Sequence, residues 1–539
     1  MAVSRLLRGT FLLTSATFIS KFLGMILVFP LNALLGEQGG ALYSYAYIPY
    51  SIMLSIATMG VPLAVSKFIS KYNTIGDYQT GRRLFRSGLK VMGLTGVISF
   101  LFLFIIAPWI APFVVNEGSV HATSDVVNVI RLVSTALIIV PAMSLMRGFF
   151  QGHQSMGPSA VSTVIEQIIR VAFIVIGCSI ALYWFQSDMQ TAVGIATLAA
   201  FVGALGGLVT LVYFWKKRKD GLNEMLTQSK PHPKKPLDEV YRELLRYAIP
   251  FVFVGLAVPL FQLVDMFTFN TALAVSGFSG DTSGAFSAYT LYGHKLIMIP
   301  VSLATGFALT LIPTVTSAYV AKRTTDVHKY ITQALQIIIF LIMPAALGLS
   351  ILAKPAYAAF FGISDQFSVY ASILGWYAPA ALLFALFTIT TSILQGVNRQ
   401  RVAMLSLTIG FIVKCLLTYP LILVLQADGA PVATMLGFGF AVLFNFYAIH
   451  RTTGYPFKRL KRRSLLVFLM CLFMCLCVGI WSATLQVWLP IENNRWNAVV
   501  VLGTGVLIGA LIYGLVALRT GYAEKVFGPG LMKKLRLRA

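Results

Sequence analysis

The feature that most constrains this chain is a series of apolar runs, each of roughly 20 residues, that recurs along its whole length. A helical run of that length spans the ~30 Å hydrocarbon core of a bilayer. Because lipid offers the backbone no hydrogen-bond partners, each run must satisfy its own amides, which forces helices. Charged residues make up only 11% of the chain, against roughly 25% in soluble proteins. The sequence therefore predicts an all-α integral membrane protein.

The apolar runs predict about fourteen transmembrane helices, or twelve to thirteen if a weak segment such as 41–69 is re-entrant. The expected helices are 11–35, 41–69, 89–114, 126–152, 159–183, 191–215, 243–276, 285–319, 329–352, 368–396, 402–424, 431–451, 464–488 and 497–518. Prolines are expected to interrupt several of them. These are Pro30, Pro49, Pro62, Pro141, Pro250, Pro259, Pro300 and Pro313.

The basic residues are divided unevenly between the two sets of connecting loops. With the N-terminus placed inside, the inner segments hold most of the 42 Lys and Arg residues, and the outer loops hold Lys354 and Arg495. Cytoplasmic loops carry such an excess. The sequence therefore predicts a multi-pass protein with both termini in the cytoplasm. The net charge of +24 then reflects topology, not a surface for nucleic acid.

The polar segment 216–242 divides the chain. Its prolines and charges indicate a cytoplasmic linker at the membrane surface. The predicted organisation is an N-lobe of six helices (1–215), the linker, a C-lobe of six helices (243–451), and two extra helices with a basic cytoplasmic tail (452–539). Three pairs recur at one constant spacing and favour two repeated lobes: Gln151-Gly152 with Gln395-Gly396, Arg170 with Lys414, and Lys21 with Asp265.

Basic residues outnumber acids inside the expected helices. The bases are Lys21, Lys67, Arg131, Arg147, Arg170, Lys295 and Lys414, and the acids are Glu166 and Asp265. Each buried charge costs at least ~2.5–3.5 kcal/mol in a bilayer, and two acids cannot neutralise seven bases. The surplus predicts a water-filled cavity with a positive lining suited to phosphate.

Six of these bases are candidate substrate-binding residues. They are Lys21, Arg131, Arg147, Arg170, Lys295 and Lys414. Lys67 lies near a helix end and is expected to snorkel to the interface. For Arg131 and Arg147, which also lie near helix ends, snorkelling and cavity lining both stay open.

The two intramembrane acids suggest separate roles. Glu166 lies four residues before Arg170 on one helix face, so the two are expected to pair, with Glu166 positioning the arginine. Asp265 has the oxygen-bearing side chains of Gln262, Thr268 and Asn270 nearby. It is a candidate site for a coupling cation, Na⁺ or H⁺. The alternative for Asp265 is a salt bridge to a lysine across the bundle.

Several short motifs resemble one family of membrane exporters. They are Leu7-Arg8-Gly9-Thr10, Ile56-Ala57-Thr58-Met59-Gly60, Ala64-Val65-Ser66-Lys67-Phe68 and Lys71-Tyr72-Asn73. With them the chain resembles, nearly end to end, the MurJ-type lipid II flippases of the multidrug/oligosaccharidyl-lipid/polysaccharide (MOP) exporter superfamily. It is most similar to their Gram-positive YtgP branch, also called polysaccharide biosynthesis proteins.

The family's functional pattern matches this chain in part. Ser20-Lys21-Phe22-Leu23-Gly24 is similar to the family's first-helix Ser-Arg-x-x-Gly, and Lys295-Leu296 through Pro300 is similar to its eighth-helix motif. Asp265 matches the family's sodium-site aspartate, whereas Leu27 stands where the family has a second arginine. A different undecaprenyl-pyrophosphate sugar or a teichoic-acid precursor is the alternative substrate.

The resemblance implies a lipid-exporting mechanism. Two lobes would enclose a central cavity, and the last two helices would frame a groove for the lipid tail. Alternating access would move the pyrophosphate-linked sugar to the outer leaflet of a bacterial cytoplasmic membrane. Membrane lipids and cell-wall synthesis proteins are the implied partners, and no cofactor is implied apart from the coupling ion.

Other classes of protein fit the sequence less well. A MATE-type drug or cation antiporter should have an acidic cavity, and the expected cavity here is basic. A membrane enzyme needs carboxylates, histidines or a nucleophile gathered at one face, and the outer loops hold scattered acids and a single histidine, His121. The five cysteines lie in apolar runs without metal-ligand spacing, so neither a metal site nor a catalytic site is predicted. A scaffold would not explain the intramembrane bases.

Overall fold

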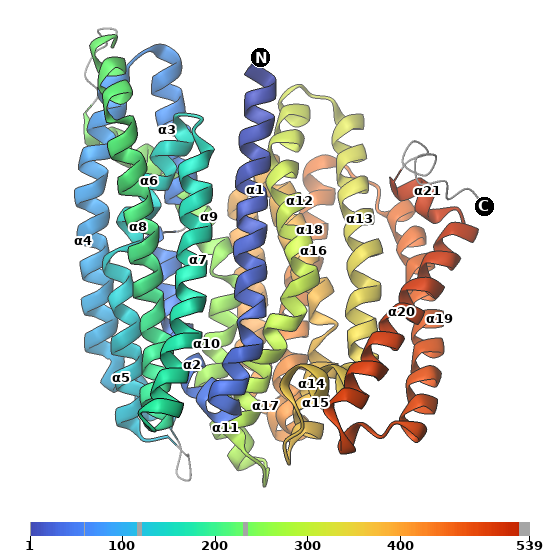
Figure 1. Cartoon of the computed structure of the whole chain (residues 1–539). Coiled ribbons are helices and arrows are strands. Elements are labelled where there is room, and N and C mark those ends of the chain that lie inside the picture. The colour runs from blue at the N-terminus through green and yellow to red at the C-terminus, as the bar shows by residue number, and fades with distance from the viewer. Residues whose placement is uncertain (1, 59, 116–120, 230–235, 528–539) are drawn as a thin grey trace. The chain divides into compact units, whose positions relative to one another are not determined.

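A computed structural model describes residues 2–58, 60–115, 121–229 and 236–527. These residues form helices with short connections and contain no strand, which confirms the predicted fold class. The chain divides into two compact units, Met1–Asn270 and Thr271–Ala539 (Figure 1). The division falls within one helix, beyond the 216–242 segment. The functional division into lobes at that segment stays a prediction.

The first unit contains ten α-helices among its described residues, the tenth of which continues past the division. They are α1 (Ala2–Ile26), α2 (Val28–Thr58), α3 (Val61–Ile75), α4 (Tyr78–Ile110), α5 (Thr123–Ser134), α6 (Val140–Gly152), α7 (Met156–Ser179), α8 (Met189–Thr227), α9 (Leu237–Gly255) and α10 (Ala257–Val275). Buried apolar side chains such as Phe68, Phe85 and Phe149 form a core shared by α3, α4 and α6.

The second unit begins within α10 and contains the remaining α-helices of the described residues. They are α11 (Thr282–Ser287), α12 (His294–Val320), α13 (Thr324–Ile351), α14 (Ala353–Phe361), α15 (Phe367–Tyr377), α16 (Ala380–Gly396), α17 (Gln400–Leu425), α18 (Gly429–Thr453), α19 (Lys458–Trp488), α20 (Arg495–Arg519) and α21 (Tyr522–Phe527). The last two long helices, α19 and α20, pack against each other and against α13 (Figure 1).

Twelve helical stretches of the described residues are long and apolar enough to cross a membrane. Two of them, Ser15–Thr58 with 44 residues and Gln400–Thr453 with 54, are long enough for two crossings each at roughly 20 residues per crossing. Gly36 (φ 60°) interrupts the first and Gln426 (φ 52°) the second. The chain is thus a multi-pass membrane protein, with a number of crossings that agrees with about fourteen.

Several segments expected as single helices are broken. In 41–69 the break comes before α3, where Gly60 has φ 83° and Pro62 stands in the first turn of the next helix. Segment 126–152 contains a 3₁₀ turn at Thr135–Ile138, and Leu256 separates α9 from α10. A left-handed glycine and a proline that lacks an amide both favour such breaks.

Other prolines stay inside continuous helices, contrary to expectation. Pro49 lies within α2, and Pro300 and Pro313 lie within α12. Transmembrane helices tolerate proline because neighbouring helices and side chains satisfy the freed carbonyls. Proline alone therefore did not locate the helix ends.

The polar segment 216–242 is helical in its first part, because α8 continues to Thr227. Lysine, arginine and glutamate favour helix, and the first proline of this segment comes only at position 231. Part of the predicted linker, residues 230–235, lies outside the described residues, as do the tail residues 528–539 and the side chains of the motif at positions 7–10.

The two units repeat one packing detail that the sequence had singled out. Gly152 ends α6 against α3, where an added Cβ would lie 2.6 Å from Ile69 Cβ. Gly396 ends α16 against α12, where an added Cβ would lie 3.0 Å from Val315 Cβ. A side chain would separate either helix pair, so glycine is needed at both positions.

Candidate functional site

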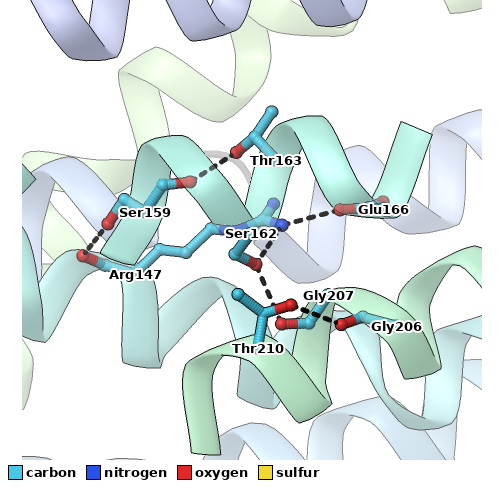
Figure 2. A network of polar contacts seen from close by, with 8 residues as sticks. All are labelled: Arg147, Ser159, Ser162, Thr163, Glu166, Gly206, Gly207 and Thr210. Carbon is cyan, nitrogen blue, oxygen red and sulfur yellow. Dashed lines mark hydrogen bonds and ion pairs between the residues drawn. The ribbon is translucent and has the colours of Figure 1, made fainter. Parts of the chain in front are cut away.

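Arg147 lies in a polar network that joins three helices of the first unit (Figure 2). Its guanidinium donates to Glu166 Oε2 at 2.7 Å and to Ser162 Oγ at 2.8 Å, both on α7. The Ser162 hydroxyl in turn donates to the carbonyl of Gly207 on α8 at 2.9 Å. The Ser159 hydroxyl donates to the Arg147 carbonyl at 3.0 Å. The network fixes α6, α7 and α8 to one another.

The expected pairing of Glu166 with Arg170 is wrong, because the Glu166 carboxylate binds Arg147 instead. Arg170 turns to α2, where its guanidinium donates to Tyr43 Oη at 3.2 Å and lies 5.1 Å from the centre of the Tyr47 ring. Helical spacing placed Arg170 within reach of Glu166, but packing brought Arg147 nearer. Arg170 forms no ion pair with any described residue.

Tyrosines on α2 form the surroundings of Arg170. The Tyr43 and Tyr47 rings stack at 5.4 Å, and the Tyr47 and Tyr50 rings lie 5.3 Å apart. The electron-rich ring faces and the hydroxyls both stabilise a guanidinium. Sequence reasoning missed this cluster, although the spacing of 43, 47 and 50 along one helix face could have indicated it.

Arg131 lies on α5 and lines a cleft. Its Nε donates to the Phe104 carbonyl at 3.4 Å, and its guanidinium lies 4.6 Å from the Phe104 ring centre. The cleft has a volume of about 540 Å³, and its lining includes Asp125 and Asp188. Arg131 therefore shares its surroundings with two carboxylates, unlike Arg170.

The remaining candidates of the first unit lie on separate helices. Lys21 is exposed on α1. Gly24, one turn further on, packs against Gln167 of α7, so close that an added Cβ would lie 3.2 Å from Gln167 Nε2. Asp265 lies on α10 and is 1% exposed.

The two candidate bases of the second unit differ in burial. Lys295 is half-buried on α12. Lys414 on α17 is fully buried, and its ammonium donates to the Ala430 carbonyl at 3.1 Å and to Thr434 Oγ1 at 2.8 Å, both on α18. The Lys414 side chain thus links two packed helices. Contact between the substrate and any of the six bases stays a prediction.

The second unit also contains a large apolar groove, of about 780 Å³. It lies between α12, α13, α19 and α20, and its walls include Pro344, Met474, Gly505 and Tyr513. Its lining on α20 runs from Leu502 to Leu518, about 24 Å of helix. This length approaches the ~30 Å hydrocarbon core.

Small residues shape the α20 wall of the groove. Gly505, Gly509 and Gly514 all line it. Glycines four residues apart leave one face of a helix without side chains, so the spacing of Gly505 and Gly509 could have indicated the groove.

Comparisons with solved structures identify the fold. A structure described as "Lipid II flippase MurJ, inward closed conformation" matches with a TM-score of 0.67 at 14% identity, covering 94% of this chain and 99% of that chain. An inward-facing MATE family transporter of the MOP superfamily matches with a TM-score of 0.62 at 13% identity, covering 82% and 94%. The fold is therefore that of a MOP-type membrane transporter.

Sequence comparisons place the chain more narrowly. The profile of the family described as "Polysaccharide biosynthesis protein" matches residues 6–319. The protein named "Lipid II flippase MurJ" from Bacillus subtilis (strain 168) is 43% identical over 539 residues, which is 99% of this chain and 99% of that protein. The chain belongs to the polysaccharide biosynthesis protein family, in the group that contains this MurJ flippase.

Proposed function

We propose that this protein is a flippase that moves lipid II, the undecaprenyl-pyrophosphate-linked peptidoglycan precursor, from the inner to the outer leaflet. The observation that carries the proposal is the 43% identity to the B. subtilis flippase over nearly the whole chain. The protein is a transporter and not an enzyme. Its substrate is lipid-linked, and membrane lipids surround it.

The intramembrane bases are the proposed contacts for the pyrophosphate. Arg170 is the strongest candidate, because its guanidinium is held by tyrosines and forms no ion pair with a described carboxylate. Arginine suits a phosphate because its planar fork can donate two parallel hydrogen bonds. Half-buried Lys295 and exposed Lys21 would add positive charge for the pyrophosphate. Arg147 would act mainly through the helices it joins.

The apolar groove is the proposed site for the polyprenyl tail. Its walls are almost entirely hydrocarbon, and they would replace part of the lipid around the tail. A tail held there keeps its contact with the bilayer while the headgroup crosses. The two helices that the resemblance assigned to the tail, α19 and α20, both line this groove.

The proposed mechanism is alternating access with both termini in the cytoplasm, as the basic loops favour. The headgroup binds the bases from the cytoplasmic side, the site closes, and it reopens outward. An inside-negative potential favours outward movement of an anion by ~2.3 kcal/mol per charge per 100 mV. Asp265 is the proposed binding site for Na⁺ or H⁺, whose inward movement would be coupled to export of the lipid. The burial of Asp265 in α10 supports this role.

One observation favours a second substrate class. Leu27 stands where the MurJ pattern has an arginine, so fewer bases face the headgroup. A different polyprenyl-linked glycan or a teichoic-acid precursor is therefore the alternative substrate. The fold is shared with MATE transporters and does not favour a drug antiporter, since the intramembrane charge is mainly basic.

Complementation tests the proposed function. In bacteria depleted of their own lipid II flippase, wild-type protein is expected to restore lipid II on the outer leaflet, measured by its accessibility to an external probe. Arg170→Ala and Lys295→Ala, expressed at wild-type level, are expected to abolish the restoration. No restoration by well-expressed wild type would favour the alternative glycan. Restoration by both variants would disprove the basic site.

Filling the groove tests the tail site separately. In Ala510→Phe, a ring replaces a methyl group on the groove wall. Displacing two CH₂ groups of the tail costs about 1.6 kcal/mol, or roughly tenfold in affinity. When the variant is expressed at a limiting level, the amount of lipid II on the outer leaflet should therefore fall strongly. Leu511→Phe is the matched control, because Leu511 is the adjacent residue and is 63% exposed. Equal exposure of lipid II with both variants would rule out the groove as the tail site.

A further inference from the structure

Arg463 lies on the side of α19 that faces the apolar groove. The positions 463, 467, 470, 474 and 478 follow one another at helical spacing and share one face. Val467 and Met470 are buried, while Met474 and Val478 line the groove. Arg463 therefore continues the groove-facing stripe, about three turns or roughly 16 Å along α19 from Met474.

Aromatic residues mark the end of the groove that Arg463 approaches, here called the Ala523 end after the lining residue on α21. Phe340 and Tyr513 line the groove there, with ring centres 5.2 Å apart. Phe340 also stacks on Tyr522 at 5.6 Å, in the first turn of α21. Tyr522 thus contacts a residue of the groove lining but does not itself line the groove.

Two tyrosines near this end are influenced by the Arg463 charge. Burial raises the pKa of Tyr455 and of Tyr522, and the Arg463 guanidinium opposes that shift in both. The Tyr455 hydroxyl is within 2.7 Å of Thr332 Oγ1 on α13. The Arg463 charge therefore acts on one phenol just before the start of α19 and on another in α21, beside the Ala523 end.

Arg463 differs from its basic neighbours on α19. It is half-buried, whereas Lys461 and Arg462 are exposed. Among the described residues, no hydrogen bond or ion pair engages its guanidinium. A cation that lies on the groove-facing side of α19 and has no acidic partner among the described residues is suited to bind an anion carried by a molecule in that groove.

We propose that Arg463 forms a phosphate-binding subsite at the Ala523 end of the groove, beside Tyr455 and Tyr522. In a polyprenyl diphosphate the first phosphate is bonded directly to the tail, so a tail lying in the groove delivers that phosphate to the groove's end. The subsite would hold the substrate from the cytoplasmic leaflet before its headgroup reaches the intramembrane bases. This inference rests on the proposed function.

The test compares variants of the full-length protein in phosphatidylcholine nanodiscs, with undecaprenyl diphosphate as the probe. Arg463→Ala is expected to bind it about tenfold more weakly, the loss typical of one charge-assisted contact. The matched control Arg462→Ala removes an exposed charge from the neighbouring position and should bind like wild type. Arg463→Lys should recover part of the affinity. Undecaprenol, which lacks phosphate, should bind equally to all of them.

Phosphatidylglycerol distinguishes the substrate from an ordinary anionic lipid, because both carry a phosphate on an apolar tail. Added to the nanodiscs, it should not displace the probe at equal concentration. Displacement that depends on Arg463 would assign the subsite to bulk lipid and overturn the proposal. Equal binding by Arg463→Ala and Arg462→Ala would also overturn it.

The outcomes separate this inference from the proposed function. If the wild-type protein binds the probe through Arg463 but does not restore lipid II to the outer leaflet of flippase-depleted cells, the lipid II assignment fails and the subsite stands. If wild type restores lipid II exposure while Arg463→Ala keeps full affinity for the probe, the subsite fails and the flippase assignment stands.

Discussion

Arg147→Ala is expected to lower the free energy of unfolding by about 3 kcal/mol, because it leaves the Glu166 carboxylate without its cation. The ion pair is shielded: the side chains of Arg147 and Glu166 are 17% and 24% exposed. The same guanidinium also binds Ser162, whose hydroxyl connects to α8. The loss should appear as a clear fall in the melting temperature of the purified protein in detergent.

A double-mutant cycle isolates the ion pair. Glu166→Ala alone should also destabilise the protein, since it leaves the Arg147 cation unpaired. The double variant Arg147→Ala/Glu166→Ala removes both charges. Its loss of unfolding free energy should therefore be smaller than the sum of the losses in the two single variants, by about 1–3 kcal/mol. Strictly additive losses would mean that the two charges do not stabilise each other, and would contradict the network of Figure 2.

Lys414→Ala is expected to destabilise the protein by about 2–4 kcal/mol. The side chain is fully buried between α17 and α18, so truncation leaves a cavity. It also removes the donor to the Ala430 carbonyl and to Thr434. Thermal unfolding of the purified variant measures the loss.

The control for Lys414 lies on the same helix. Leu416 is 69% exposed, so Leu416→Ala should leave the melting temperature nearly unchanged. Lys414→Met keeps most of the volume, and should recover the part of the loss that comes from the cavity. A Lys414→Ala protein of wild-type stability that no longer exposes lipid II would argue for direct substrate contact, as the sequence suggested.

Much of the architecture could be predicted from the sequence because it depends on local chemistry. Backbone in lipid must be helical, so the length of each apolar run located the helices. One expected helix ends at residue 35 and the next begins at residue 41. In the structure, Gly36 lies between these two positions and has a non-helical backbone conformation. Shorter breaks, such as Thr135–Ile138, depend on how a neighbouring helix packs, and sequence reasoning did not find them.

The candidate site could be predicted only as a set of residue types. The cost of burying charge singled out the same bases that the structure places within helices, but it could not choose their partners. Glu166 had Arg170 within reach on its own helix, and packing gave it Arg147 from α6. Lys414 and Arg170 hold matching positions in the predicted repeat, yet one is fixed by α18 and the other by tyrosines of α2.

The sequence by itself determined that this chain is a helical membrane protein with an excess of intramembrane cations, because hydrophobic length and charge are properties of single segments. Only the tertiary structure decided which cations are neutralised and where an apolar groove opens. Both depend on side chains from helices far apart in the sequence, such as α13 and α20, which meet only in the folded chain.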